Sequence, residues 1–295
     1  MRWEPEVARG AWLGERVVEQ AGDMHIAVPR GFEAYARVFH PIEADLPVGA
    51  TWADVARAGR VWSSGFERRA ASWTEVAEAS GATVHPLMQW GAITQGGLET
   101  VSAVGLVGAA GWRYGEPIPG TPGAEVVALL ARVLAEHTSS PAAGVAAVWE
   151  GWGGLFAGDP GRAVLSFTST DEAIGTRLRT AVTPPDPLGS DIRLGPRLSL
   201  PWRDHVLFDA GVDEFAAPDW PARAPWVGST AWPECPSLIW PDDHAWVVVS
   251  EIDWDSTIVA GGRAAIDAVL AASGIEALEI PEGADLSSRG DTING

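Results

Sequence analysis

Residues 236–262 have the sequence PSLIWPDDHAWVVVSEIDWDSTIVAGG, in which a strong strand pattern and concentrated polar residues coincide. The stretch HAWVVVSEI, residues 244–252, predicts a β-strand because it is rich in β-branched and aromatic residues. Its first half is apolar on both faces, which is typical of a strand buried inside a sheet. A Trp-Pro-Asp-Asp turn precedes it, and a Gly-Gly pair follows. We therefore expect a central strand whose C-terminal end becomes acidic.

Further strands and helices are expected on both sides of this segment. Strand patterns cover six other ranges: 24–28, 34–39, 144–149, 163–167, 204–209 and 275–280. Helical patterns cover 51–59 and 72–81, a segment beginning at Thr121-Pro122, and 263–273. The first two helices each have a hydroxyl residue at the start, an acid three residues later and a glycine at the end. Together these elements predict an α+β fold with a mixed or antiparallel sheet flanked by a few helices.

One break in the pattern suggests two subdomains. Residues 184–191, PPDPLGSD, contain three prolines and a glycine, which disfavour regular structure. We place a boundary there, with an N-terminal α+β subdomain at 1–183 and a C-terminal α+β subdomain at 192–281. Residues 282–295 are polar and rich in small residues, and we expect them to form a mobile tail.

Composition excludes several classes of function. All 20 basic residues are arginine, so no lysine is present for Schiff-base chemistry or for a P-loop. The net charge of −19 repels phosphate backbones, and we expect no nucleic-acid partner. The single cysteine, Cys235, cannot form an intrachain disulfide or a multi-cysteine metal site.

Cellular location is also limited by the sequence. The N-terminal residues lack the apolar core of a signal peptide, and no run of 18 apolar residues occurs. We expect a soluble cytoplasmic protein with no membrane association. A lysine-free, tryptophan-rich composition with 16 tryptophans is consistent with a GC-rich genome.

The acidic end of the central strand is the main candidate polar site. If the extended backbone continues, Glu251, Asp253 and Asp255 lie on one face, spaced about 7 Å apart. Such carboxylates could bind a hard cation or act as a general acid and base. Alternatively, the strand simply enters solvent and its end is polar. No ligand set for a metal is assigned, and no cofactor is expected.

The turn before the strand offers a second candidate. Asp242 and His244 point to the same side of an extended segment, so the carboxylate could orient an imidazole base. The alternative is an ordinary aspartate turn next to a surface histidine. His40, His85 and His205 could approach His244 in space, but no spacing typical of a histidine metal site occurs.

Tryptophan is concentrated in the same region. Seven tryptophans lie between Trp202 and Trp254, and they could form a stacking platform for a ligand. Trp240 and Trp254 are the candidate aromatic binding residues. Core packing is the alternative, because a tryptophan side chain buries a large apolar area.

Residues 237–262 and residues 72–90, SWTEVAEASGATVHPLMQW, resemble segments of an uncharacterised actinobacterial protein family. Its C-terminal signature is a Trp-Pro turn, a strand with an acidic end of the form Glu-x-Asp, and a Gly-Gly pair. The resemblance covers less than a fifth of the chain. It implies an origin and a cytoplasmic setting, and it implies no activity and no catalytic residue.

Two classes of function remain. The first is a non-catalytic role in protein interaction or ligand binding, with a possible protein partner for the acidic or tryptophan-lined surface. The second is a metal- or carboxylate-dependent hydrolase centred on residues 251–255, which requires those carboxylates and His244 to converge in one pocket. We favour the first because no recognised catalytic spacing occurs.

Overall fold

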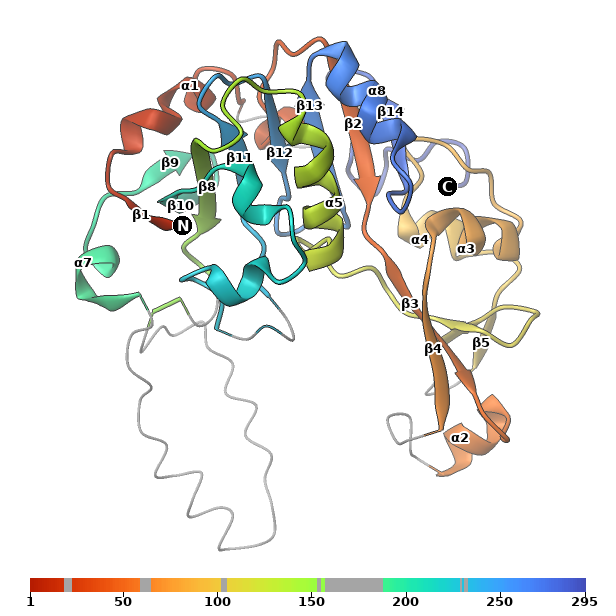
Figure 1. Cartoon of the computed structure of the whole chain (residues 1–295). Coiled ribbons are helices and arrows are strands. Elements are labelled where there is room, and N and C mark those ends of the chain that lie inside the picture. Colours follow the sequence, from red (N-terminus) through yellow and green to blue (C-terminus); the bar gives the residue numbers. More distant parts are fainter. Residues whose placement is uncertain are drawn as a thin grey trace, which may run out of the picture.

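The computed structural model contains two antiparallel sheets, which confirms the expected α+β class (Figure 1). The structure describes residues 1–18, 23–58, 65–101, 105–152, 155–156, 188–228, 230 and 233–295. Within these residues one sheet has nine strands and the other has five. The described part of the chain contains no helix that is long and apolar enough to cross a membrane.

The large sheet has the strand order β1-β10-β8-β11-β12-β13-β2-β14, and β9 pairs with β10. All of its pairings are antiparallel. Its strands are β1 (Arg2–Glu4), β2 (Ala34–Phe39), β8 (Gly144–Trp149), β9 (Leu198–Leu200), β10 (Arg203–Asp209), β11 (Leu238–Pro241), β12 (Trp246–Val249), β13 (Ser256–Gly261) and β14 (Ala277–Ile280).

Both faces of the large sheet are covered, which explains the continuous apolar run in β12. Trp246 and Val248 pack on the face covered by α5 (Ala124–Ala135) and α8 (Arg263–Ala271). Val247 and Val249 pack on the opposite face, under α1 (Ala11–Gly14), the 3-10 turn η2 (Met24–Ile26) and residues 284–286. Four further short helical segments are η1 (Val7–Gly10), α7 (Gly189–Arg193), η3 (Val212–Phe215) and η4 (Trp220–Arg223).

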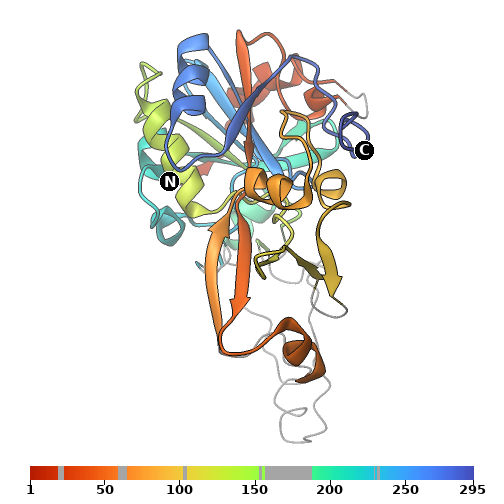
Figure 2. The ribbon, with the colours of Figure 1, turned by 90° about the vertical axis from the view of Figure 1, so that its right-hand side faces the viewer.

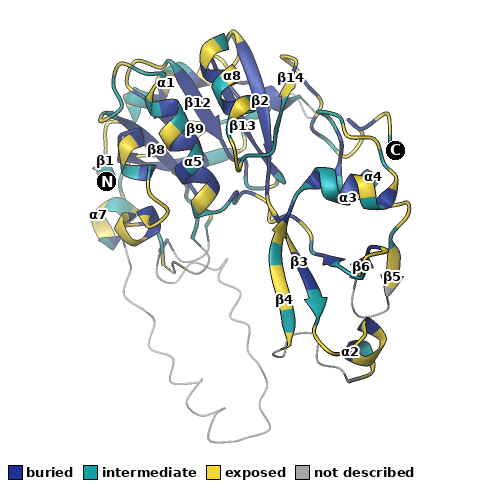
Figure 3. Ribbon diagram, turned by 45° about the vertical axis from the view of Figure 1, so that its right-hand side comes forward, coloured by how far each residue is buried: buried dark blue, intermediate teal, exposed yellow. Residues whose placement is uncertain are grey.

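The small sheet has the order β4-β3-β7-β6-β5 and extends away from the large one. Its hairpin of β3 and β4 projects from the body, with α2 at its tip (Figure 2). Exposure rises toward the tip of this hairpin, whereas the large sheet is almost entirely buried (Figure 3). The elements of this part are β3 (Ile42–Pro47), α2 (Trp52–Ala58), β4 (Phe66–Ala71), α3 (Trp73–Ser80), α4 (Trp90–Ile93), β5 (Glu99–Val101), β6 (Gly105–Val107) and β7 (Arg113–Tyr114).

The helix caps expected from the sequence are present. The Ser72 hydroxyl accepts a hydrogen bond from the Glu75 backbone N–H at 3.0 Å, and Gly81 ends α3 with a φ of 78°. At α2, the Thr51 hydroxyl accepts from the Asp54 N–H, and the Asp54 carboxylate accepts from the Thr51 N–H. Local capping chemistry therefore defines both helices.

Three expected elements differ from the structure. Residues 24–28 contain the 3-10 turn η2 instead of a strand, because the Asp23 carboxylate accepts from the His25 N–H. Helix α5 begins at Ala124, after Gly123, and not at Pro122. The central strand ends at Val249, earlier than expected. The expected strand at 163–167 lies outside the described residues.

The chain is not partitioned in space as its composition suggested. Strand β8 of the expected N-terminal subdomain lies between β10 and β11 of the C-terminal one, and β2 lies between β13 and β14. Antiparallel pairing joins strands distant in sequence, so a proline-rich break does not separate two cores. Residues 184–187 of that break are outside the described part.

Residues 282–295 were expected to form a mobile tail, but they pack against the rest of the protein. The Asp291 side chain is buried and accepts hydrogen bonds from the Gln89 N–H and from His85. The Asn294 amide bonds the backbone of Thr83. A polar composition gave no sign of these contacts, because their partners lie about 200 residues earlier in the chain.

Candidate functional site

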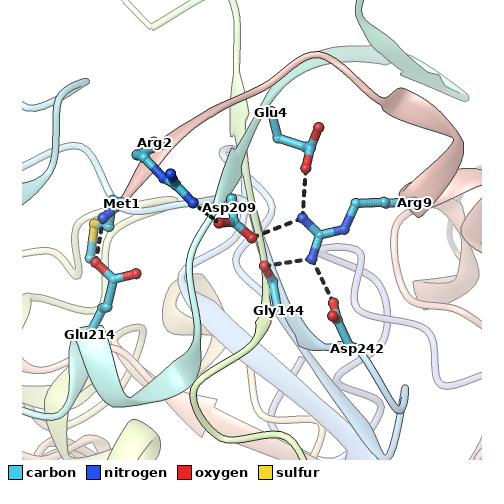
Figure 4. A network of polar contacts seen from close by, with 8 residues as sticks. All are labelled: Met1, Arg2, Glu4, Arg9, Gly144, Asp209, Glu214 and Asp242. Carbon is cyan, nitrogen blue, oxygen red and sulfur yellow. Dashed lines mark hydrogen bonds and ion pairs between the residues drawn. The ribbon is translucent and has the colours of Figure 1, made fainter.

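The turn between β11 and β12 is held by intramolecular contacts. The Asp242 carboxylate accepts a hydrogen bond from Arg9 at 2.6 Å, and the same guanidinium contacts Glu4, Asp209 and the Gly144 carbonyl (Figure 4). These contacts attach the N-terminal segment to the sheet. Asp242 therefore has a structural partner in this network.

His244 lies beside Asp242 in sequence but contacts a different partner. Its ring stacks on Trp12, with centroids 4.4 Å apart and an interplanar angle of 23°. Asp243 accepts hydrogen bonds from Thr138 and Ser139. Burial and the nearby Arg16 lower the pKa of His244, against the opposing effect of Asp242 and Asp243. The expected pairing of Asp242 with His244 as an oriented base gains no support from these contacts.

The turn between β12 and β13 separates the three carboxylates that strand parity placed together. Residues 250–255 form a hairpin connection, in which the Trp254 N–H donates to the Glu251 carbonyl at 3.0 Å. Glu251 and Asp253 both contact Arg203 Nη2, at 2.9 and 2.6 Å. Asp255 instead contacts the buried Arg37 at 3.2 Å. Strand alternation fails here because the backbone is no longer extended.

Glu251 and Asp253 lie at a pocket of about 430 Å³. The pocket lies over the start of β10, the start of β11 and the end of β12. It is on the face of the sheet that is covered by η2 and the C-terminal residues. Its lining is largely apolar and comes from five parts of the chain: Asp23, Ile26, Ala27, Leu200, Pro201, Trp202, Arg203, His205, Ser237, Leu238, Val249, Glu251, Asp253, Trp254, Leu286 and Ser287. A concave apolar pocket with a few polar groups is the usual form of a small-molecule site.

Three buried polar atoms at this pocket have no hydrogen-bond partner among the described residues. They are His205 Nδ1, Ser237 Oγ and Arg203 Nε. The His205 and Ser237 side chains belong to residues that are each only 3% exposed. Buried polar groups are nearly always satisfied in native proteins, so each such group requires an explanation. These three atoms have almost no solvent-accessible surface, so they lie within the wall of the pocket and not on its surface.

The titratable groups at the pocket have shifted pKa values. Burial lowers the pKa of His205 to about 4, so the imidazole is neutral at physiological pH. Burial also raises the pKa of Glu251, although its ion pair with Arg203 opposes the shift. Perturbed groups at one concave site are a recognised feature of functional sites.

The rim of the pocket contains a strained backbone position. Pro201 and Trp202 connect β9 to β10, and Trp202 has a φ of 74° and is 67% exposed. Proline followed by a residue with positive φ matches a type II turn, whose third position favours glycine. A bulky residue at positive φ is a genuine outlier, and such strain concentrates at functional sites.

The two tryptophans singled out from the sequence have different environments. Trp240 is 1% exposed and packs edge-on against Trp12 in the core. Trp254 is partly exposed and lines the pocket. Only the second is available to a ligand, since the first is covered by the N-terminal segment.

The structure brings no metal site together within its described residues. No group of three or more His, Cys, Asp or Glu side chains suited to a metal ion occurs there. His40 bonds Thr257 and the Ile118 carbonyl, and His85 bonds Asp291, away from His205. Burial raises the pKa of Cys235 to about 12, which keeps its thiol protonated.

Sequence reasoning missed Arg203 and Ser237, and it considered His205 only as a metal ligand. One local signal was available: the Pro201-Trp202 pair between two strands predicts a tight turn at which tryptophan is unusual. Nothing in the sequence shows that this turn faces residues 251–254, because that contact arises from the order of strands in the sheet.

No family model, curated protein or solved structure matches this chain. The resemblance to an uncharacterised actinobacterial family therefore stays a prediction.

Proposed function

We propose that this protein binds a small organic ligand in the pocket between the Pro201-Trp202 turn and residues 251–254, without catalysing a reaction on it. This is the ligand-binding form of the non-catalytic role expected from the sequence. The single observation that carries the proposal is a largely apolar pocket of about 430 Å³ whose lining also contains the ion-paired Arg203, Glu251 and Asp253.

The energetic argument rests on apolar burial. A ligand in the pocket covers the apolar side chains of Leu200, Leu238 and Val249. Removing apolar surface from water stabilises the complex by about 25 cal/mol per Å². The volume suits a molecule of roughly 10–20 non-hydrogen atoms on general grounds of pocket size.

The hydrolase alternative receives less support. Asp255 and His244 do not line this pocket, and Glu251 and Asp253 are both engaged by one guanidinium. An open position for water between an acid and a base is therefore not evident from these contacts. A possible protein partner stays a prediction, for which Trp202 offers the exposed aromatic side chain.

The test is a thermal-shift screen of small amphipathic molecules on the full chain, followed by calorimetric titration of those that stabilise it. A ligand specific for the native state stabilises it by RT ln(1 + L/Kd), where L is the free ligand concentration, so Tm rises with the logarithm of that concentration once it exceeds Kd. Ala27→Phe places a ring in the pocket and should abolish the stabilisation by every molecule that binds there. Ala53→Phe, on the exposed side of α2, adds the same ring elsewhere and should leave stabilisation unchanged.

Two results would contradict the proposal. One is a screen in which no molecule stabilises the unmodified protein. The other is a set of ligands whose affinity is equal in Ala27→Phe and the unmodified chain, since these bind elsewhere. Circular dichroism of both variants establishes that each one is folded before titration.

A further inference from the structure

We propose that the ligand is an organic cation, a protonated amine carried on an apolar body, with its charged nitrogen at Glu251 and Asp253. This inference rests on the proposed ligand-binding function and adds the chemical class of the ligand. It follows from two independent features of the pocket: the sign of its charge and its aromatic rim.

The first feature is an excess of negative charge. The lining contains three carboxylates, Asp23, Glu251 and Asp253, against one guanidinium, Arg203. Asp23 is neutralised from outside the lining by Arg30, at 2.8 Å. Glu251 and Asp253 therefore share Arg203, and they contact the same nitrogen, Nη2. The lining therefore has one carboxylate in excess at this point, although the largely exposed Asp253 is screened by solvent, and an entering cation would bind beside it.

The net charge of the whole chain, −19, acts in the same direction. A cleft of one charge sign raises the local concentration of oppositely charged solutes and speeds their association. An anionic ligand would have to approach two carboxylates to reach Arg203. The electrostatics thus favour a cation over an anion in both rate and affinity.

The second feature is the pair of tryptophans at the rim. Trp202 and Trp254 both line the pocket, and in sequence they adjoin two of its charged residues, Arg203 and Asp253. The face of an indole ring attracts a cation, and an indole is the strongest of the aromatic side chains in this respect. The strained φ of 74° at Trp202 keeps an exposed indole where glycine would suit the turn better.

The experiment compares matched probes that differ only in the charge of the head group. Titration calorimetry uses ammonium, alcohol and carboxylate forms of three bodies: 2-phenylethyl, 2-cyclohexylethyl and n-hexyl. At pH 7 and low salt we expect the ammonium form of at least one body to bind about ten-fold more tightly than its alcohol. The carboxylate form should bind most weakly. Charge-assisted hydrogen bonds are about twice as strong as neutral ones, which is the basis of this preference.

Three variants assign that preference to the proposed residues. Glu251→Gln and Asp253→Asn each remove one charge and keep a similar shape, so each should reduce the ammonium preference to about three-fold or less. Asp253 is largely exposed, which makes its variant safe for folding. Asp267→Asn removes an exposed charge on α8, on the opposite face of the sheet, and should retain the full preference.

The outcomes separate this inference from the function on which it rests. If alcohol and ammonium forms bind equally, or the carboxylate binds best, the cation is wrong while the ligand-binding pocket stands. If the preference survives in both pocket variants, the charge acts elsewhere and the assignment to Glu251 and Asp253 is wrong. If no probe binds the unmodified protein, the proposed function and the cation both fail.

Discussion

The two turns on either side of β12 have similar compositions and different environments. Residues 242–245 and residues 250–255 both contain aspartates, and both adjoin a buried strand. In the first turn Arg9 binds Asp242, and Trp12 stacks on His244. In the second, Arg203 binds Glu251 and Asp253 at the edge of a cavity with unpartnered polar atoms. The two turns thus differ in the residues that pack against them: Arg9 and Trp12 of the N-terminal segment in the first, and Arg203 of β10 in the second.

Two buried histidines, His40 and His205, also differ in their hydrogen bonds. His40 has both ring nitrogens bonded, to the Ile118 carbonyl and to Thr257, as in a satisfied core residue. His205 is equally buried, but its Nδ1 has no partner and its ring interacts with the Leu198 backbone. Two equally buried imidazoles can therefore differ in how many of their ring nitrogens are bonded.

The largest expected effect concerns His205 and pH. Its pKa is lowered to about 4 by burial, while the unfolded chain titrates near 6.5. The unfolded state therefore binds the proton first, and stability present above pH 6.5 is lost as the pH falls toward 4. His205 contributes about 3 kcal/mol to this loss. The free energy of unfolding of both proteins falls between pH 7 and pH 4. In His205→Gln this fall, measured by urea titration, should be about 3 kcal/mol smaller than in the unmodified protein.

His40→Gln provides the comparison for that measurement. Burial also lowers the pKa of His40 to about 4, so this variant should flatten the same pH range. At pH 7, however, it breaks two hydrogen bonds and should cost about 2 kcal/mol. His205→Gln should cost less at pH 7, because Nδ1 has no partner and only the interaction with the Leu198 backbone is lost. Equal costs at pH 7 would contradict the distinction between the two histidines.

The second effect compares the two arginines. Arg9→Met removes the cation from three carboxylates, Glu4, Asp209 and Asp242, and should lower the free energy of unfolding by about 2 kcal/mol. Arg203→Met removes the cation from two, one of which is largely exposed, and should cost about 1 kcal/mol. Urea titration at pH 7 measures both. A greater loss in Arg203→Met would show that the second turn is the more important structural contact.

The smallest effect concerns Trp202 and His244, the two non-glycine residues with positive φ in the described part of the chain. Trp202→Gly relieves the backbone strain and should raise the free energy of unfolding by about 1 kcal/mol. It should also weaken ligand binding, since the indole is lost from the rim. His244→Gly gains the same backbone freedom but loses the stack on Trp12, so no net stabilisation is expected. A destabilised Trp202→Gly protein would mean that the indole serves packing instead of binding.

The parts of the fold that depend on short-range chemistry could be predicted. The α+β class, the caps of α2 and α3, and the strands β2 and β8 follow from alternation and capping patterns. Strand β13 and the hairpin at 250–255 were not predicted. The acidic residues after Val249 were interpreted as the end of one strand. In the structure they form a turn, and the returning strand β13 pairs with β12, which satisfies the backbone hydrogen-bonding groups of both strands.

The candidate site could be predicted only in part. Glu251, Asp253 and Trp254 were identified and do line the pocket, whereas Asp255, Asp242, His244 and Trp240 lie elsewhere. The separation has a geometric cause, since a turn directs successive side chains to different partners. Arg37, which lies in β2, binds Asp255. Arg9, in the N-terminal segment, binds Asp242.

The sequence by itself determined the class of fold, the buried central strand, the acidic charge and the absence of lysine chemistry. These properties depend on local periodicity and on composition, which are present in any linear stretch. The tertiary structure alone decided which carboxylates face a cavity. Arg9 and Asp242 are 233 residues apart, and Arg203 and Glu251 are 48 apart. Contacts of that separation form only when the order of strands in the sheet is set, and they place one acidic turn against the N-terminal segment and the other at the pocket.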